Sequence, residues 1–505
     1  MEPWVQRYVF VSQKNYLPER HDLQVIYRGE SASFSWTQIT ASYLAKLRDI
    51  ASNELKTTVT DVVIAVPGWF TEIQRRALID AAAIANLNVL RLINDTTATA
   101  LGYGITKSDL PEPENPRHVV FIDVGHADMS VAVVAFSKGQ LSVKSTAYEP
   151  NLGGRDIDYA MLEHFSKEFK TKYKIDVMKN TKAVFRLSAG CEKLKKVLSA
   201  NTEAPLNVES IMNDVDATSK LTRDELEQLI QPVLDAIPGP LERAIKDSGL
   251  TLDQIDAIEL IGGTTRVPAV RNRIQASFPG KTLSFTLNQD EAIARGATFS
   301  CAMLSPVFRV RDFHVTDVNH YPVNVHWVTS PTDPEEDTEL LVFPQGNVIP
   351  SSKVLTFYRR EPFSIDASYA EPSLLPGKFN PWIGRFTVHD LPLPANGDSA
   401  CVKVKTRLNS HGTTSFEAAY IEEVEEREEP APMDVDPSAE GAAPQAPKKK
   451  RVVKKKEIKF ETKDASLEKT VVESYREQET GMHAADKLVM DTEVRLLFVR
   501  VHYAY

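Results

Sequence analysis

The hydrophobic pattern of this chain changes at Ser305-Pro306, and that change limits the folds open to it. Up to residue 304, short apolar runs of strand type alternate with longer segments in which apolar residues recur at helical spacing. After residue 306 the helical spacing fades, and short alternating runs are separated by Pro, Asn, Asp and Gly. We therefore predict a multidomain chain with an α/β domain followed by an all-β sandwich.

Turn and capping residues place the individual elements. Residues 61–67 form an apolar run closed by Pro67, which predicts a buried strand, and a capping box from Thr71 to Gln74 begins a helix that reaches Ile84. Further strands are predicted at 89–93, 118–124 and 257–261, with a hairpin of 129–136 and 140–148. Further helices are predicted at 96–103, 156–172, 181–199, 222–237 and 290–304. In the second part, strands are predicted at 307–315, 323–328, 340–343, 354–358 and 363–369.

Composition excludes several classes of protein. The 505 residues are 42% hydrophobic, which is enough for more than one core, and the net charge of -10 disfavours nucleic acid as a partner. The three cysteines suit neither a zinc site nor a disulfide framework and indicate a reducing compartment. No apolar run spans a bilayer and residues 1–10 do not resemble a secretory signal, so we expect no membrane partner. The expected location is the cytoplasm, with the nucleus as an additional compartment.

One long segment has the composition of a disordered loop. Residues 422–440 are acidic and rich in Pro and Ala, and residues 447–456 are strongly basic. Such a sequence cannot bury enough apolar surface to order itself, so 421–457 is predicted to be a disordered loop. Residues 447–452 resemble a nuclear import signal. The favoured alternative is a solvated basic run that balances its acidic neighbour.

Two strand ends carry residues that suit a phosphate or a nucleotide. A predicted strand ends at Asp123, and Gly125 follows, where a backbone without side chains can approach a polyphosphate and the carboxylate can hold metal-bound water. Gly262 and Gly263 leave another predicted strand shortly before a helix, and Arg266 could stack on a planar base. Ordinary turn chemistry explains each of these segments equally well when it is considered alone.

A third segment offers donors and acceptors on one helical face. Glu192, Lys195, Lys196 and Ser199 share that face of the predicted helix 181–199. Such a mixture suits the hydroxyls of a ribose and the edge of an adenine. A solvated charged face is the simpler interpretation of this helix by itself.

Taken in order along residues 34–463, these segments resemble the heat-shock-seventy superfamily, whose ATPase domain has the actin-like fold. Residues 93–98 resemble its first connecting motif, 121–126 its second phosphate motif, 260–268 its adenosine motif and 288–298 its second connecting motif. The large hundred-and-ten-kilodalton heat-shock class is the most similar one. His126 follows Gly125, Arg155 follows Gly153-Gly154, and residues 305–310 resemble the interdomain linker of that class.

The resemblance implies ATP or ADP with Mg²⁺ as cofactors and a set of site residues. Asp123 would lie near the metal and hold it through a water molecule. It is also the candidate for a catalytic role. The nucleotide would be bound by Gly125, His126, Gly153, Gly154, Glu192, Lys195, Lys196, Ser199, Gly262, Gly263, Thr264, Arg266 and Asp290.

The resemblance also implies a function. The resemblance to the large class implies a nucleotide exchange factor that acts on a heat-shock-seventy partner and also holds unfolded polypeptides. A foldase that hydrolyses ATP, and an interaction protein with a vestigial site, are the alternatives. The family is a weak ATPase, but nothing in residues 1–33 resembles its first phosphate loop, so the sequence leaves hydrolysis open.

The implied organisation has five parts, with the family's opening strands and its terminal helical bundle missing. They are a nucleotide-binding domain at 1–304, a linker at 305–312, a β-sandwich at 313–420, the loop at 421–457, and a last strand with a truncated helical region at 458–505.

Overall fold

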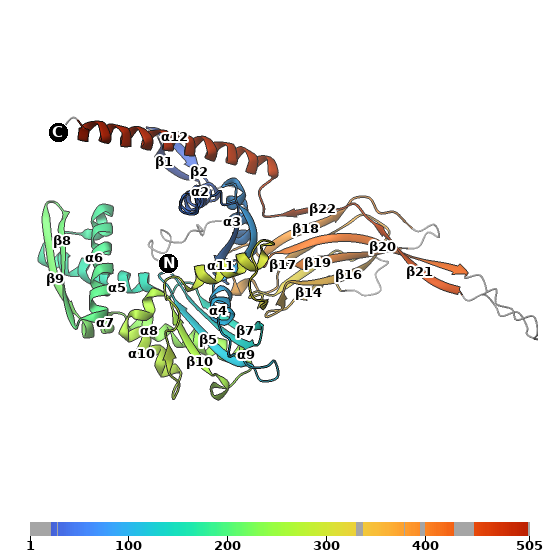
Figure 1. The fold of residues 1–505 in the computed structure, drawn as a ribbon, viewed down its shortest axis with the longest axis horizontal. Helices are drawn as coiled ribbons and strands as arrows, with labels where there is room; N and C mark the ends of the chain where they lie inside the picture. Colours follow the sequence, from blue (N-terminus) through green and yellow to red (C-terminus); the bar gives the residue numbers. More distant parts are fainter. Residues whose placement is uncertain are drawn as a thin grey trace, which may run out of the picture. The chain divides into compact units, whose positions relative to one another are not determined.

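The computed structural model describes residues 22–27, 29–329, 337–377, 379–393, 399–428 and 449–502. The chain forms two compact units (Figure 1). The first gathers the residues up to His320 and those from Leu467 onward, and the second is built from Tyr321–Leu375 and Phe379–Ser466.

A mixed sheet forms the centre of the first unit, with strands in the order β11-β10-β5-β6-β7-β12. These strands are β5 (Arg117–Val124), β6 (Met129–Ser137), β7 (Gln140–Glu149), β10 (Ala257–Ile261), β11 (Leu283–Ser284) and β12 (His314–Val318). β5, β6 and β7 are antiparallel, and β10 runs parallel to β5. Along β5, Val120 and Ile122 enter one core cluster while Val119 and Phe121 enter another. Both faces are therefore covered, as the continuous apolar run predicts.

Helices and further two-stranded sheets complete this unit. They include β1 (Leu23–Tyr27), β2 (Glu30–Phe34), α2 (Trp36–Leu55), β3 (Asp61–Val66), α3 (Glu72–Ile84), β4 (Asn88–Asn94), α4 (Asp95–Ile105), α11 (Ala292–Leu304) and α12 (Lys469–His502). The capping box predicted at Thr71 and Gln74 is present. α4 and α11 cross closely, because a Cβ at Gly296 would overlap the carbonyl oxygen of Ala98. Val472 and Tyr475 of α12 pack on the cluster that α2 and α3 share.

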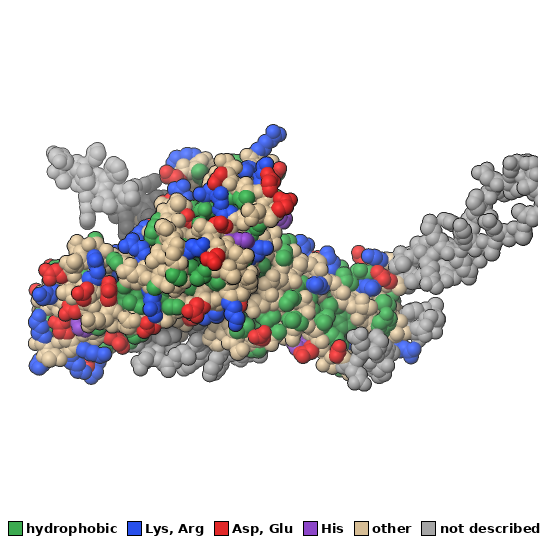
Figure 2. All heavy atoms as spheres, turned by 90° about the horizontal axis from the view of Figure 1, so that it is seen from below, with side chains coloured by type: hydrophobic (Ala, Val, Ile, Leu, Met, Phe, Trp, Pro, Cys, Tyr) green, Lys and Arg blue, Asp and Glu red, His purple; other side chains and the backbone are tan. Residues whose placement is uncertain are grey.

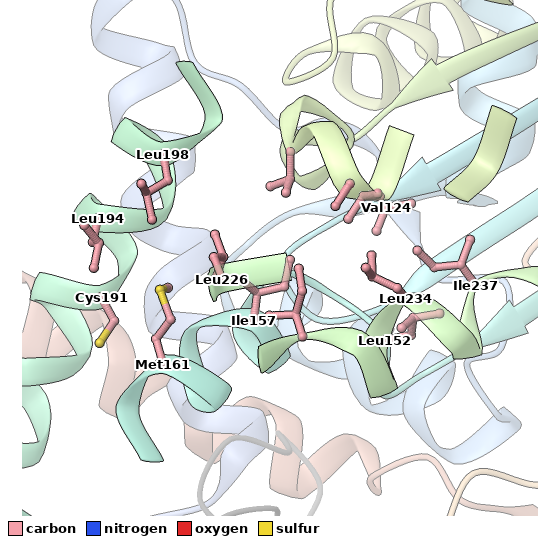
Figure 3. Packing of buried hydrophobic residues seen from close by; sticks show 14 of the residues in the cluster. Val124, Leu152, Ile157, Met161, Cys191, Leu194, Leu198, Leu226, Leu234 and Ile237 are labelled. Atoms are coloured by element: carbon pink, nitrogen blue, oxygen red, sulfur yellow. The ribbon is translucent and has the colours of Figure 1, made fainter. Parts of the chain in front are cut away.

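The helices that flank the candidate site pack on the larger core cluster. They are α5 (Gly154–Lys172), α6 (Thr181–Ala200), α9 (Pro238–Ser248) and α10 (Pro268–Ser277), and a hairpin of β8 (Glu203–Met212) and β9 (Val215–Thr222) packs on α6. Figure 3 shows Cys191 of α6 and Met161 of α5 in this core. Burial raises the pKa of the Cys191 thiol to about 12, so it is an inert core side chain.

The helix predicted at 222–237 is interrupted. It consists of α7 (Arg223–Leu229) and α8 (Gln231–Ala236), and α9 begins directly afterwards. Pro232 and Pro238 lie in the first turns of α8 and α9, where the missing N–H of proline does no harm but an uninterrupted helix could not continue. Sequence patterns missed α2 and the β8–β9 hairpin, whereas α10 is the helix expected shortly after Gly263.

The second unit consists of two facing sheets. One has the order β14-β13-β17-β18-β22 and the other β16-β19-β20-β21. The strands are β13 (Val323–Trp327), β14 (Glu339–Phe343), β16 (Ser351–Arg359), β17 (Phe363–Tyr369), β18 (Trp382–Val388), β19 (Ala400–Leu408), β20 (Thr414–Glu428), β21 (Lys449–Glu457) and β22 (Glu461–Asp464), and the short β15 (Val348–Ile349) precedes β16. The ring centroid of Phe386 in β18 lies 5.4 Å from that of Phe416 in β20, which joins the two sheets across the core.

Three further sequence predictions differ from the structure. Residues 307–313 form no strand, and β12 belongs to the sheet of the first unit, so residues 313–320 do not belong to the β-sandwich. The prediction of a disordered loop is wrong at both ends, because residues 421–428 and 449–457 are paired strands; residues 429–448 lie outside the described part of the chain. The region 458–505 is divided, with β22 in the second unit and α12 in the first.

The surface and the helices bear on possible partners. Basic and acidic side chains are interspersed on the face shown in Figure 2 and do not gather into one large patch there. No helix in the described ranges is both long and apolar enough to cross a membrane.

Candidate functional site

Three separate segments meet at the carbonyl oxygen of Gly125. This glycine follows β5 and begins the turn into β6. Its carbonyl oxygen accepts a hydrogen bond from the backbone N–H of Gly154 (3.0 Å) and another from the Thr264 hydroxyl (2.7 Å). The turn, the start of α5 and the short 3₁₀ helix η3 (Gly263–Arg266) therefore share one point of contact. The structure brings together the phosphate and adenosine motifs that are far apart in sequence.

Glycines are required where these segments touch. A Cβ at Gly153 would lie 2.5 Å from the carbonyl oxygen of His126, and one at Gly154 would lie 2.6 Å from the Thr264 hydroxyl oxygen. Gly262 has φ +79°, and a Cβ there would overlap both the Asp123 carboxylate and the Val124 carbonyl oxygen. Gly263 is different, because a Cβ there would have no neighbour closer than 3.8 Å. Of these four glycines, Gly153 and Gly262 therefore lie against neighbouring backbone, whereas Gly154 lies against the side chains of Thr264 and Lys195.

Three carboxylates gather beside this turn. Burial raises the pKa of Asp123 to about 7, and the charge of Asp128 adds to the effect. Burial, followed by the charges of Asp123 and Asp128, raises the pKa of Asp95 well above its usual range. Burial also raises the pKa of Asp128, although the indole N–H of Trp69 donates to its carboxylate at 2.9 Å. Like charges held together in this way favour binding of a proton or a cation.

The sequence analysis missed Asp95, Asp128 and Trp69 as site residues. Asp95 lies in the first connecting motif and Asp128 lies three residues beyond Gly125. Both could therefore have been predicted as site residues from the acidic residues in or next to these motifs. In the described ranges, no three His, Cys, Asp or Glu side chains lie close enough to hold a metal ion together. Carboxylate oxygens are ligands that Mg²⁺ prefers, and Mg²⁺ is usually bound through one or two of them while it keeps several waters.

Lys195 has a structural role at the site. Its side chain is buried and its ammonium donates to the Asp158 carboxylate (2.7 Å) and to the Gly154 carbonyl oxygen (3.0 Å). Burial raises the pKa of Asp158, and the charge of Lys195 opposes that shift. The lysine therefore ties α6 to the first turn of α5, and both of these hydrogen bonds are made within the protein.

The other predicted residues on α6 are more accessible. Lys196 forms an exposed ion pair with Glu192 at 2.7 Å, one helical turn away. The Ser199 hydroxyl donates to the Lys195 carbonyl oxygen at 2.9 Å. Glu192 and Lys196 remain available to a ligand, because an exposed pair exchanges easily with water.

Arg266 and Asp290 form the second accessible pair. The guanidinium donates to both carboxylate oxygens, at 3.1 Å and 2.6 Å, and both side chains are more than half exposed. This bidentate contact fixes the plane of the guanidinium next to Gly263, as a group that stacks on a flat base requires.

His126 and Arg155 sit where the turn meets α5. The backbone N–H of Arg155 donates to the His126 carbonyl oxygen at 2.9 Å, and its guanidinium donates to the Pro150 carbonyl oxygen at 3.2 Å. The His126 side chain is exposed. The positive charge of Arg155 also acts on the nearby carboxylates and lowers the pKa of Asp128.

Known proteins are similar in sequence to this chain over most of its length. A family profile described as "Hsp70 protein" matches residues 7–497. Heat shock protein hsp88 of Neurospora crassa is 50% identical over 473 residues, which cover 93% of this chain and 67% of that protein. A heat shock protein homolog of Saccharomyces cerevisiae is 44% identical over 94% of this chain and 68% of its own length. Heat shock 70 kDa protein 4 of Rattus norvegicus is 44% identical over 83% of this chain, but half of that protein lies outside the match.

Proposed function

This chain belongs to the Hsp70 family, in its Hsp110 class, and from that premise we propose that it is a nucleotide-binding co-chaperone. It binds ATP or ADP with Mg²⁺, promotes nucleotide exchange on an Hsp70 partner and holds unfolded polypeptides. The observation that carries the proposal is the convergence at Gly125, where the start of α5 and Thr264 both bind one carbonyl oxygen. Function belongs to the site and not to the fold, so the argument rests on these contacts.

The residues around Gly125 suit a nucleotide in two parts. The turn after β5 and the start of α5 bring backbone close to where phosphates would lie, and Asp123 would hold the metal through water. The exposed pairs of Glu192 with Lys196 and Arg266 with Asp290 would contact the ribose and the base. Bound Mg²⁺ supplies positive charge that neutralises the phosphates and the crowded carboxylates.

Exchange is favoured over hydrolysis as the main activity. His126 and Arg155 replace the glycine and the acidic residue that ordinary members of the family carry in these motifs. In the class that this chain resembles, the ATP-bound form grips the Hsp70 partner and releases its ADP. Nucleotide would thus act as a ligand that selects one conformation of the chain.

A foldase that hydrolyses ATP is the second candidate. It is favoured by Asp123, whose pKa of about 7 is suited to accepting a proton from water at physiological pH. Turnover of ATP that is coupled to refolding of a substrate, in the absence of any partner, would distinguish this candidate from exchange.

The test is release of a fluorescent ADP from a purified Hsp70 partner. We expect the chain with Mg-ATP to accelerate release at least tenfold, and Gly263→Asp to abolish the acceleration. Gly263 is the right target because the position is open, so the new carboxylate occupies the ligand's space without breaking the fold. Gly481→Asp, at a position of α12 with nothing within 4 Å, is the matched control.

Binding of nucleotide is measured separately from exchange. Millimolar Mg-ATP should raise the melting temperature, because a ligand at a hundredfold excess over its Kd stabilises the folded state by about 2.7 kcal/mol. A shift without accelerated release would exclude exchange while leaving nucleotide binding intact. A cooperative melt without any shift would leave a nucleotide-independent holdase.

A further inference from the structure

The two strands at the end of the second unit form a ribbon with complementary charge. β20 continues past its neighbour β19, whose last pairing partner on it is Ile421, and within the described ranges Glu422 to Glu428 pair with β21 and with no other strand. We refer to residues 422–428 and 449–455 as the charged ribbon. Figure 1 shows β21 beside the far end of β20, beyond the other strands of the sheet.

The register places residues of opposite charge across the ribbon. Five glutamates lie on its β20 side, and the β21 side carries Lys449, Lys450, Arg451, Lys454 and Lys455. Four of the paired positions join opposite charges, namely Glu422 with Lys455, Glu423 with Lys454, Glu426 with Arg451, and Glu428 with Lys449. Arg427 opposite Lys450 is the one pair of like charge in the register. Cross-strand pairs of opposite charge stabilise a hairpin, so the acidic strand selects this basic strand as its neighbour.

The inner end of the ribbon is anchored, and at its outer end no third strand among the described residues pairs with it. The Lys455 ammonium lies 4.7 Å from the ring centroid of Tyr420, and Glu422 also forms an ion pair with Lys403 of β19 at 3.6 Å. From Glu423 outward, β19 no longer pairs with β20. A two-stranded ribbon is only marginally stable in water when no further strand pairs with it. The outer half can therefore open at little cost.

We propose that the acidic end of β20 masks β21, which is a basic strand recognised in extended form by the acidic groove of a nuclear import receptor. A basic run of this length is the kind of segment that such a groove binds. While β21 is paired, one edge of its backbone is occupied by β20, and the register sets glutamates opposite its basic positions. Opening of the outer ribbon would free residues 449–451 for the receptor.

The register favours a competing receptor over a purely structural role. The register places glutamates 423, 426 and 428 opposite basic positions of β21, and an acidic groove would offer the same chemical group to those positions. A polyanion such as heparin would bind the same charges without requiring an extended backbone. The two partners can therefore be separated by experiment.

The first test compares affinities for a purified import receptor by fluorescence anisotropy. We expect a peptide of residues 447–457 to bind at least tenfold more tightly than the full chain, and the triple variant E423Q/E426Q/E428Q of the full chain to recover most of that difference. K449A/K450A/R451A should abolish binding. The control E114Q/E209Q/E468Q changes net charge equally at exposed positions outside the ribbon and should leave affinity unchanged.

The second test locks the ribbon by a disulfide. Glu426 and Arg451 are directly opposite, so E426C/R451C should cross-link under oxidising conditions and lose receptor binding, which a reducing agent restores. Each single cysteine variant is a control for the three native thiols. Equal binding of the peptide and the full chain would overturn masking. Failure of the peptide to bind, or a gain in heparin binding by the glutamine variant without a gain in receptor binding, would overturn the assignment of the partner.

Discussion

The two sides of the candidate site are built on different physical principles. The proposed phosphate side, around Gly125, is fixed by close packing and by a buried ion pair, since Gly153, Gly154 and Gly262 have no space for a Cβ and Lys195 is paired internally. The adenosine side consists of exposed ion pairs, Glu192 with Lys196 and Arg266 with Asp290. The phosphate side should therefore respond to mutation through stability, and the adenosine side through affinity.

Two adjacent lysines give the sharpest test of this difference. Lys195→Met leaves the buried Asp158 without its partner, so we expect a loss of roughly 3 to 5 kcal/mol in the free energy of unfolding. Lys196→Met removes only an exposed pair one residue away and should leave the urea midpoint unchanged. Equal loss in both variants would remove the distinction between the two sides.

Two adjacent glycines make the next comparison. Gly262→Ala places a Cβ against Asp123 and Val124 at a positive φ, and should destabilise the fold by about 2 to 4 kcal/mol. Gly263→Ala enters open space and should melt like the unmodified chain. Thermal unfolding followed by circular dichroism distinguishes them, and a tolerant Gly262 would contradict close backbone packing at this turn.

The raised pKa of Asp123 predicts that a higher pH lowers the folding stability of the free protein but strengthens its binding of Mg-nucleotide. The folded state holds its proton up to about pH 7, whereas the unfolded state releases it near pH 4, so stability should fall as pH rises from about 4 to 7. Asp123→Asn should flatten part of that slope, stabilise the free protein by about 1 to 2 kcal/mol at pH 8, and weaken Mg-nucleotide binding. Calorimetric titration across pH 6 to 8 should show affinity of the unmodified chain rising with pH, and a flat profile would exclude Asp123 from the metal's surroundings.

The smallest effect is expected at Arg266. Arg266→Ala removes an exposed guanidinium that Asp290 orients, so stability should not change measurably. Affinity for Mg-ATP should fall about two- to fivefold, the contribution of an exposed cation–π contact. Arg266→Lys keeps the charge but not the flat surface, and recovery of full affinity by lysine would show that stacking is not involved.

Sequence alone determined much of the fold and the position of the site motifs. Hydrophobic spacing located β5, β6, β7, α5 and α6, because each buries a regular face or stripe, and the order of the glycine and aspartate motifs indicated the family. Hydrophobic spacing did not distinguish the structural role of Lys195 from the exposed position of Lys196. Two lysines on one helical face have the same pattern in sequence, and only the packing of a neighbouring helix buries one of them.

Tertiary structure alone decided the remaining points. Asp95, at the start of α4, joined Asp123 and Asp128 only because packing places α4 against β6, where Ser130 donates to its carboxylate and where burial and the like charges raise its pKa. The segment that composition marked as disordered became β20 and β21 at its ends, because charges far apart along the chain are complementary only in their cross-strand register. Local sequence specifies periodic faces, whereas contacts between distant segments depend on the packing that brings them together.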